Sequence, residues 1–167
     1  MNDSKKIQDT IEILNKQIPD PRLGLPEEVF LFISRLTPMV NVDLLIKDKK
    51  GLALLSWRDD LYAGTGWHLP GGIIRFRENI ESRILKVAET EIGTAIEFDP
   101  APIAINQVFC NHETRGHFIS LLIRCSISGN FIPENKGLTK TDAGYLMWHD
   151  SCPENIIHVH EMYRDYL

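Results

Sequence analysis

The sequence has few cysteines, and they show no recognisable spacing. Its 167 residues contain three, Cys110, Cys125 and Cys152, without a Cys-x-x-Cys pair. An odd number without that spacing excludes a disulfide framework and a zinc knuckle, and it favours a reducing compartment. No apolar run approaches the ~20 residues of a membrane helix, and the charged N-terminal stretch lacks the apolar core of a signal peptide. We therefore expect a cytoplasmic protein with no membrane partner.

An excess of positive charge is also absent. The chain has 18 lysines and arginines against 23 aspartates and glutamates, which gives a net charge of -5. Proteins that bind nucleic acid need a basic face, so we expect no nucleic-acid partner. With 43% hydrophobic and 25% charged residues, the composition is that of an ordinary globular chain. A phosphate-bearing ligand must therefore be met by local positive charge or by a cation.

The beginning of the chain is predicted to form an extension outside the main domain. Isoleucine and leucine recur at helical spacing over residues 7–18, and the proline-rich stretch 19–24 ends that helix. We assign residues 1–24 to a helical extension with its linker and residues 25–167 to a single domain. A second helix is expected over residues 26–37, where proline and two glutamates suit the first helical turn.

The rest of the chain is predicted to form strands mixed with two further helices. Strands are expected over residues 39–48, 52–58, 66–70, 95–99, 103–110, 117–127 and 145–150. Helices are expected over residues 79–92, with Gly93 in the left-handed stop position, and over residues 156–166. Because strands and helices do not alternate regularly, we predict an α+β sandwich.

A glutamate near the end of the helix predicted over residues 79–92 does not fit a plain apolar face. At 100° per residue, Glu91 falls between Ile80 and Ile84 in the apolar arc. A carboxylate facing a core is costly unless it is paired or coordinates a cation, and a helix C-terminus also disfavours an anion. A divalent cation relieves both penalties. The alternative is a partly exposed arc in which Glu91 meets an arginine.

A glycine pair precedes that helix. Gly71 and Gly72 follow a predicted strand and allow the backbone to approach a ligand closely. The carbonyl of Gly71 suits Mg²⁺, which takes oxygen ligands and keeps substrate phosphates and waters. A Pro-Gly-Gly run alone is more often a turn. Its connection to Glu91 through one loop and one helix makes it a candidate metal site.

The unit from Gly72 to Gly93 resembles the signature of the Nudix hydrolases. That signature reads G-x5-E-x7-R-E-U-x-E-E-x-G-U, where U is apolar, and Glu78 stands at the position of its first glutamate. The Arg-Glu pair is replaced by Lys-Val, the first of the two adjacent glutamates is Thr90, and only the second survives, as Glu91. The resemblance implies a Nudix-type α/β/α sandwich with a mixed sheet, plus the extra N-terminal helix.

The two losses look like the GDP-mannose mannosyl hydrolase branch of that family, which has an incomplete signature and cleaves a sugar–phosphate glycosidic bond. The similarity runs from about residue 25 to residue 148. The strand aspartate of the branch matches Asp43, and its arginine after a Leu-Leu strand matches Arg58. The resemblance implies a nucleoside diphosphate sugar as substrate, Mg²⁺ as cofactor with Mn²⁺ as an alternative, and a homodimer.

The same resemblance implies roles for the matched residues. Mg²⁺ on Glu91 and on the Gly71 carbonyl, together with Arg58, would neutralise a departing nucleoside diphosphate. Asp43 would orient the arginine or the substrate. The alternative for Arg58 is a solvated charge at a strand end, paired with one of the two aspartates that follow it.

Other positions depart from the branch. Its Gln-His pair, a metal ligand and a general base, aligns with Asp142 and Ala143, so the histidine is absent. Asp142 is the remaining candidate for catalytic base or metal ligand, and a turn aspartate is the alternative. Arg75 lies two positions after the place of an arginine of the branch. His112 and His117 are candidate substrate contacts, for which a solvated and a structural role respectively are the alternatives.

Three functions follow from these residues. We expect Mg²⁺-dependent hydrolysis of a nucleoside diphosphate sugar, similar to GDP-mannose, at the glycosyl–phosphate bond. The first alternative is cleavage of a pyrophosphate by the same scaffold. The second is a nucleotide-sugar-binding module that has lost catalysis. The two N-terminal helices are candidates for the dimer interface, and His158 and His160 receive no role.

Overall fold

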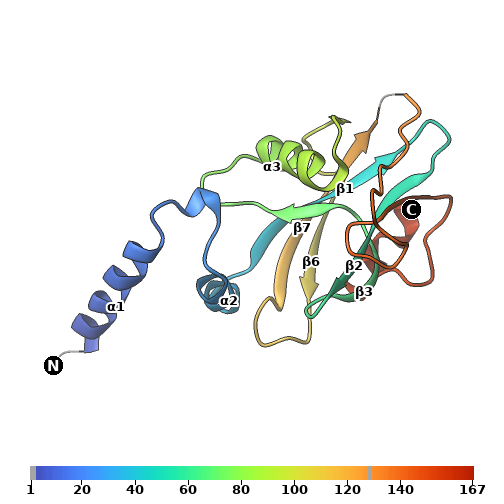
Figure 1. The fold of residues 1–167 in the computed structure, drawn as a ribbon. Helices are drawn as coiled ribbons and strands as arrows, with labels where there is room; N and C mark the ends of the chain where they lie inside the picture. The colour runs from blue at the N-terminus through green and yellow to red at the C-terminus, as the bar shows by residue number, and fades with distance from the viewer. Residues whose placement is uncertain (1–2, 128) are drawn as a thin grey trace.

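The sheet is built around its central strand, β1. The computed structural model describes residues 3–127 and 129–167. The elements in chain order are α1 (Asp3–Gln17), η1 (Pro21–Leu23), α2 (Glu27–Leu36), β1 (Met39–Lys47), β2 (Ala53–Asp60), β3 (Gly64–His68), β4 (Gly71–Ile73), α3 (Ile80–Val87), η2 (Ala88–Ile92), β5 (Glu97–Phe98), β6 (Ala104–Phe109), β7 (His117–Ser126), β8 (Leu146–His149) and η3 (His158–Tyr166) (Figure 1).

Strand β1 is buried on both faces, which its composition explains. Val42, Leu44 and Ile46 are fully buried on one face, and Leu45 is buried on the other. A strand covered on both sides carries a continuous apolar run, as β1 does over residues 44–46, in place of strict alternation with polar residues. β1 runs parallel to β7 and antiparallel to β2 and β4. The sheet is therefore mixed, as expected.

The strand order is β3-β2-β1-β7-β5, and the remaining strands pair with its members. β4 pairs with β1, β6 with β7, and β8 with β2. The β1–β4 register places Asp43 opposite Gly71 and Asn41 opposite Ile73. The glycine pair thus lies directly beside the polar residues of β1.

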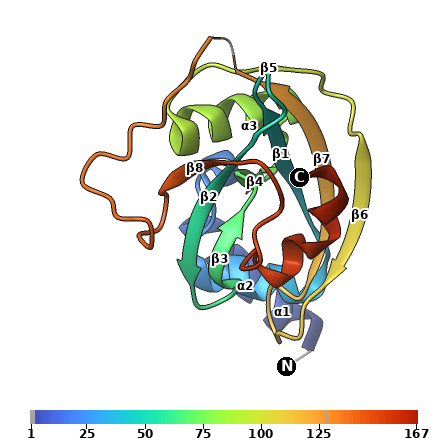
Figure 2. The same cartoon turned by 90° about the vertical axis from the view of Figure 1, so that its right-hand side faces the viewer.

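Helical segments cover both faces of the sheet. On one face, Ile84, Val87 and Ala88 pack with Ile92 against the buried residues of β1. On the other face, Tyr163 of η3 is fully buried in a second apolar cluster. Figure 2 shows α3 and η3 on either side of β1. The predicted α+β sandwich is confirmed, although a 3-10 helix occupies the place of the α-helix expected over residues 156–166.

The helix expected over residues 79–92 is α-helical only as far as Val87. Asn79 caps it, because its side chain accepts a hydrogen bond from the Ser82 N–H at 2.7 Å. The last turn, η2, is a π-helix closed by a hydrogen bond from the Gly93 N–H to the Ala88 carbonyl at 2.9 Å. Gly93 has the predicted left-handed conformation, with φ of 75°. Only the wider final turn differs from the expectation.

The first helix lies apart from the sheet. Every residue of α1 is exposed except Leu14, which is half-buried, and the helix projects from the rest of the chain (Figure 1). The linker after it is held by Arg75, whose Nη1 donates to the Arg22 carbonyl at 3.2 Å. Within the described ranges, no helix combines the length and apolarity that a membrane crossing requires.

Candidate functional site

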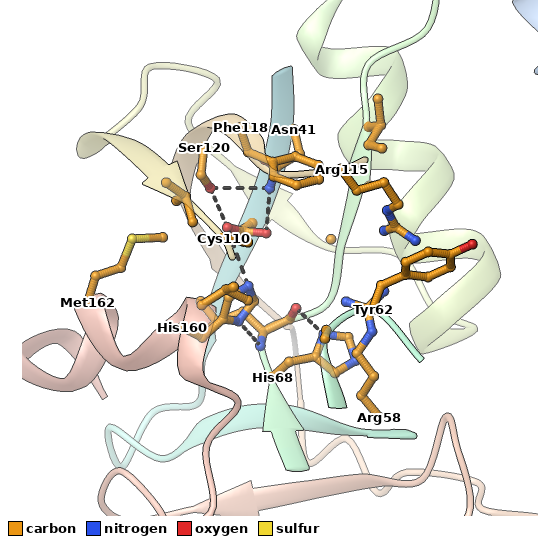
Figure 3. A pocket seen from close by; sticks show the side chains of 18 of the residues that line it. Asn41, Arg58, Tyr62, His68, Cys110, Arg115, Phe118, Ser120, His160 and Met162 are labelled. Carbon is orange, nitrogen blue, oxygen red and sulfur yellow. Dashed lines mark hydrogen bonds and ion pairs between the residues drawn. The ribbon is translucent and has the colours of Figure 1, made fainter. Parts of the chain in front are cut away.

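A cavity of about 130 Å³ lies beside the glycine pair. Strands β1, β2, β3 and β4 contribute to its wall, as do the β6–β7 loop and η3. Figure 3 shows polar side chains from these elements turned toward one another. Elements far apart in the sequence therefore build one polar site.

Asp43 forms the buried end of this cavity. It is 3% exposed, and its carboxylate accepts hydrogen bonds from Asn41 Nδ2 at 2.9 Å and from the Tyr163 hydroxyl at 2.8 Å. The Ser120 hydroxyl donates to the same carboxylate. Burial raises the pKa of Tyr163, so this hydroxyl stays a neutral donor. A buried carboxylate with several donors is held in one orientation.

His160 packs against Asp43 from η3. Its Nδ1 accepts a hydrogen bond from the Leu69 N–H at 3.0 Å, and its Nε2 lies 3.7 Å from Asp43 Oδ2. The ring therefore carries its hydrogen on Nε2. Burial lowers the pKa of His160, so the ring is neutral at ordinary pH.

His68 is a second neutral histidine on the cavity wall. Its Nδ1 donates to the Leu69 carbonyl at 2.7 Å, which leaves the Nε2 lone pair available. Burial, together with the neighbouring His160 and Arg58, lowers its pKa to about 3. The imidazole can therefore accept a hydrogen bond but does not hold a proton at neutral pH.

Arg58 of β2 lines the same cavity, and Figure 3 shows it beside His68. Its Nε is paired with Asp60 Oδ2. Of the two aspartates that follow the arginine, the structure thus selects the second as its partner. The pair is about 30% exposed on each side. Arg58 therefore forms the strand-end ion pair that the sequence analysis gave as the alternative, and it also lies on the cavity wall.

Glu91 lies close to three of the other nominated residues. Its pKa is raised to about 7, mainly by burial and also by the negative charge of Asp43. A hydrogen bond from the Gly71 N–H and the positive charge of Arg58 act in the opposite direction. These interactions require that Glu91 lie near Gly71, Arg58 and Asp43. The structure thus brings the four residues into one region, although Glu91 is not on the cavity wall itself.

The glycine pair makes this arrangement sterically feasible. A Cβ at Gly71 would lie 2.6 Å from Asp43 Oδ1, and a Cβ at Gly72 would lie 3.0 Å from Val87 Cγ2. Contacts this short exclude a side chain at Gly71 and disfavour one at Gly72. Strand β4 can approach β1 and α3 only because both positions are glycine.

The oxygen atoms of the site suit a hard cation that takes most of its ligands from water and substrate. Among the described residues, no three His, Cys, Asp or Glu side chains are grouped so that they could hold a metal ion. Glu91 and the backbone at Gly71 supply oxygen atoms, which Mg²⁺ prefers. Mg²⁺ usually binds through one or two carboxylates and keeps waters and substrate phosphates. The residues are therefore compatible with Mg²⁺ bound together with a phosphate-bearing ligand.

Other nominated residues lie elsewhere. Asp142 is in a turn, where its Oδ2 accepts from the Thr139 N–H at 2.6 Å; this backbone hydrogen bond lowers its pKa. Arg75 is bound to the N-terminal linker. His117 stacks on Phe109 at a centroid distance of 4.6 Å. These three are not on the cavity wall, whereas His112 is.

Several cavity residues escaped the sequence analysis. Among them are Asn41, Ser120, His160 and Arg115. Tyr163, which is not on the wall itself but hydrogen-bonds to Asp43, also escaped it. Ser120 and Tyr163 meet Asp43 across 77 and 120 positions of the chain, so no local spacing indicates the contact. His160 lies in the helix predicted over residues 156–166, where it received no role.

Comparison with solved structures identifies the fold. A MutT Nudix hydrolase from Burkholderia pseudomallei is 19% identical, with a TM-score of 0.61 over 78% of this chain and 98% of that one. The Nudix domain of NrtR from Shewanella oneidensis, complexed with ADP ribose, is 15% identical, with a TM-score of 0.52 over 84% and 88%. A MutT protein from Methanosarcina mazei is 19% identical, with a TM-score of 0.50 over 68% and 78%. At these identities the likeness shows the fold alone, and the expected Nudix-type fold is confirmed.

Comparison of sequences gives a relative that matches half of the chain. The low-salt glycan biosynthesis protein Agl8 from Haloferax volcanii is 29% identical over 83 residues. The match covers 50% of this chain and 53% of that protein, so the chain spans about half the length of the curated relative. No family model matches the chain.

Proposed function

We propose that this protein is a Mg²⁺-dependent Nudix hydrolase that acts on a nucleoside diphosphate sugar and cleaves the glycosyl–phosphate bond. The observation that carries the proposal is the convergence of Glu91, Gly71, Arg58 and Asp43 at one end of a polar cavity. Two likenesses support the class of substrate. A domain of the same fold holds ADP ribose, and the sequence relative is named for glycan biosynthesis.

The bond changes of this reaction are simple. The oxygen of a water molecule bonds to C1 of the sugar, the bond from C1 to the phosphate oxygen breaks, and the water loses a proton to solvent. The nucleoside diphosphate departs as an anion, so it needs charge neutralisation more than it needs protonation. Attack at phosphorus would demand more metal and base assistance than one carboxylate provides.

The chain's own residues divide this work. Arg58 presents guanidinium donors to the departing diphosphate. Asp43, fixed by Asn41 and Tyr163, orients the substrate or the arginine. Glu91 and the Gly71 carbonyl would hold Mg²⁺, which when bound supplies additional positive charge at the leaving group.

The other candidate residues would act at or beyond the edge of this group. Asp142 would serve as base or metal ligand only after giving up its hydrogen bonds to Thr139. Arg75 and His117 would contact the substrate beyond the cavity, and His112 would contact it at the wall. A cytoplasmic location is likewise still a prediction.

The test is a panel of nucleoside diphosphate sugars incubated with Mg²⁺, with product analysis. We expect turnover in the wild type and a loss of at least about 100-fold in Glu91→Gln, because one charged contact to the leaving group is removed. Glu89→Gln is the matched control, since Glu89 is exposed and pairs with Lys86 at 2.8 Å. Turnover that is unchanged in Glu91→Gln would overturn the proposal.

The position of bond cleavage is decided by reaction in ¹⁸O-labelled water. Label in the sugar identifies attack at C1, which we expect. Label in a phosphate would instead establish the pyrophosphate-cleaving alternative with the same residues.

A binding module is the second candidate, and one observation favours it. In the helical part of the signature only Glu91 remains of three glutamates, and the described residues include no cluster of three metal-binding side chains. Calorimetry that shows tight binding of a nucleoside diphosphate sugar, without product on prolonged incubation with Mg²⁺, would favour this function over hydrolysis.

We also propose that the protein forms a homodimer through α1. A helix of this length is marginal alone in water, yet α1 buries none of its residues on its own chain. The linker that follows it is bound by Arg75, whose Nη1 donates to the Arg22 carbonyl at 3.2 Å. The same chain has an uncovered apolar sheet face, which we call the β6 face: Val40, Ile105 and Phe109, of which the last two are 69% exposed. Reciprocal docking of α1 on the β6 face of a second copy covers both surfaces under twofold symmetry.

A further inference from the structure

Arg115 is held at the cavity wall by an element outside the sheet. It lies in the β6–β7 loop with a φ of 52°, which is uncommon for a residue other than glycine. Its N–H donates to the Ser34 hydroxyl at 3.0 Å, and the same hydroxyl donates to the Leu31 carbonyl at 2.9 Å. Ser34 is 3% exposed on α2. Helix α2 therefore fixes the backbone of a cavity arginine in a conformation that needs external support.

The guanidinium of Arg115 lies near two aromatic rings and has one buried donor, Nε, without a hydrogen-bond partner among the described residues. Its Cζ lies 4.5 Å from the ring centroid of Tyr62 and 5.6 Å from that of Phe30. Aromatic faces stabilise the charge of an arginine but leave its N–H groups free for an acceptor. A buried donor without a partner indicates a ligand that supplies the acceptor.

Arg115 and Arg58 form a pair of like charges on one cavity. Burial lowers the pKa of Arg115, and the positive charge of Arg58 lowers it further. Asp60 is the carboxylate that attracts both, but its Oδ2 pairs with Arg58 and its Oδ1 accepts from the Tyr62 and Ala63 N–H groups. Two guanidinium groups thus share one carboxylate. This end of the cavity carries excess positive charge in a chain whose net charge is -5.

Arg58 stands between the two ends of the site. Its charge acts on Glu91 at one end and on Arg115 at the other. Arg58 and Arg115 both line the cavity, so a ligand that engages both guanidinium groups must carry negative charge at two neighbouring positions. A diphosphate meets this requirement, and each of its phosphoryl groups can accept paired hydrogen bonds from a guanidinium.

We propose that Arg115 and Arg58 form a two-arginine site for a diphosphate group, in which Arg58 binds one phosphoryl group and Arg115 binds the next. The identity of the ligand as the diphosphate of a nucleotide sugar rests on the proposed function, but the anion site itself does not. Helix α2 contributes to this site by positioning Arg115 through Ser34. The aromatic pair of Tyr62 and Phe30 keeps the guanidinium oriented while no ligand is bound.

The experiment measures binding of inorganic pyrophosphate and inorganic phosphate by calorimetry, in EDTA and at low ionic strength. The wild type is expected to bind pyrophosphate at least tenfold more tightly than phosphate. In Arg115→Gln, pyrophosphate affinity should fall by tenfold or more, toward that of phosphate, whereas phosphate binding at Arg58 should hardly change. Arg124→Gln is the matched control, because Arg124 is an exposed arginine of β7 that is not on the cavity wall.

Equal pyrophosphate affinity in the wild type and Arg115→Gln would overturn the proposal, as would a wild type that does not distinguish pyrophosphate from phosphate. If Arg115→Gln does not fold, Arg115→Lys decides, because it keeps the charge and loses paired donation, and should weaken pyrophosphate binding alone. The two proposals fail separately. Pyrophosphate binding without turnover of any nucleotide sugar removes the hydrolase, and turnover with undiminished pyrophosphate binding in Arg115→Gln removes the two-arginine site.

Discussion

Two histidine rings hold the backbone of Leu69 between them. The Leu69 N–H donates to Nδ1 of His160, and its carbonyl accepts from Nδ1 of His68. The rings therefore carry their hydrogens on different nitrogens, Nε2 in His160 and Nδ1 in His68. Since Leu69 lies two residues before Gly71, these hydrogen bonds fix the backbone that enters the glycine pair. Both rings are neutral in this arrangement, which makes the stability of the fold sensitive to acid.

That sensitivity can be measured in the His68→Gln variant. Burial lowers the pKa of both rings below the ordinary value of 6.5, that of His68 to about 3. Below pH 6.5 the folded chain then binds fewer protons than the unfolded chain, so stability that is present at neutral pH is lost as the pH falls. Each ring should contribute a loss of up to ~1.4 kcal/mol in the free energy of unfolding per pH unit. Denaturant titrations between neutral pH and about pH 5 should show a shallower loss in His68→Gln.

The control for this measurement is His158→Gln, which removes an exposed histidine of η3. It should retain the slope of the wild type. The same slope in His68→Gln and in the wild type would show that His68 titrates alike in the folded and unfolded chains, which contradicts its neutral buried state.

Individual site residues were predictable where a local pattern breaks a rule. Glu91 could be nominated because a carboxylate in an apolar helical arc is costly, and Gly71 because a glycine pair follows a strand. Asp43 and Arg58 required a family resemblance, since a lone aspartate or arginine in a strand indicates little. His160 and Arg115 could not be found, because their roles depend on contacts with Leu69 and with α2 that the chain makes only after folding.

The β4–α3 connection is closed by a buried ion pair. Glu78 Oε2 accepts from Arg83 Nε at 2.9 Å and from the Arg75 N–H at 2.8 Å, and it lies 2.8 Å from Arg83 Nη2. The side chains of Arg83 and Glu78 are only 9% and 17% exposed. Arg83 Cδ lies 3.2 Å from where a Cβ of Gly72 would be. The fixed spacing from Gly72 to Glu78 thus has a structural purpose, which is to tie the loop to the first turns of α3.

Loss of this pair should destabilise the protein strongly. Glu78→Gln leaves the charge of Arg83 buried without a partner, so we expect the free energy of unfolding to fall by about 3 kcal/mol. Chemical denaturation measures the change. The double variant Glu78→Gln with Arg83→Met should recover part of the loss, because it removes the stranded charge as well.

Glu81→Gln provides the comparison, because Glu81 is an exposed acid in the first turn of the same helix. Its effect should be within about 0.5 kcal/mol. A Glu78→Gln variant as stable as Glu81→Gln would show that the pair does not hold the loop, and the role of Glu78 would then have to be sought in ligand binding.

At the scale of elements, the sequence predicted the two ends of the helical segment better than the geometry of its last turn. Asn79 and Gly93 bound the helical segment as expected, because side-chain capping and a left-handed glycine are local effects. The π-turn over Ala88–Ile92 inserts extra length into the last turn, and apolar spacing cannot reveal it. Lys86, which stands where the family signature has an arginine, is exposed and pairs with Glu89. The buried arginine of α3 is Arg83, about one turn earlier.

For the whole molecule, the fold class was readable and the placement of its parts was not. Apolar strands without regular α/β alternation predicted the mixed sandwich. Only the structure shows that η3 closes the second face and that α1 contacts so little of its own chain. The positions of η3 and α1 depend on contacts between residues far apart in the chain, which the periodicity of apolar residues does not reveal. The net charge of -5 likewise conceals the excess positive charge that Arg58 and Arg115 concentrate on the cavity.

The exposed α1 makes a prediction about mass in solution. Light scattering coupled to size exclusion should give twice the chain mass of 19.1 kDa for the wild type. Ile7→Asp with Ile11→Asp places charge on the apolar stripe of α1 and should give the monomer mass, and Ile105→Asp on the β6 face should do the same. Lys5→Gln with Lys16→Gln changes as many residues of α1 without touching that stripe, so it should remain dimeric. A monomeric wild type would contradict the dimer, and a dimer that survives Ile105→Asp would place α1 on another surface.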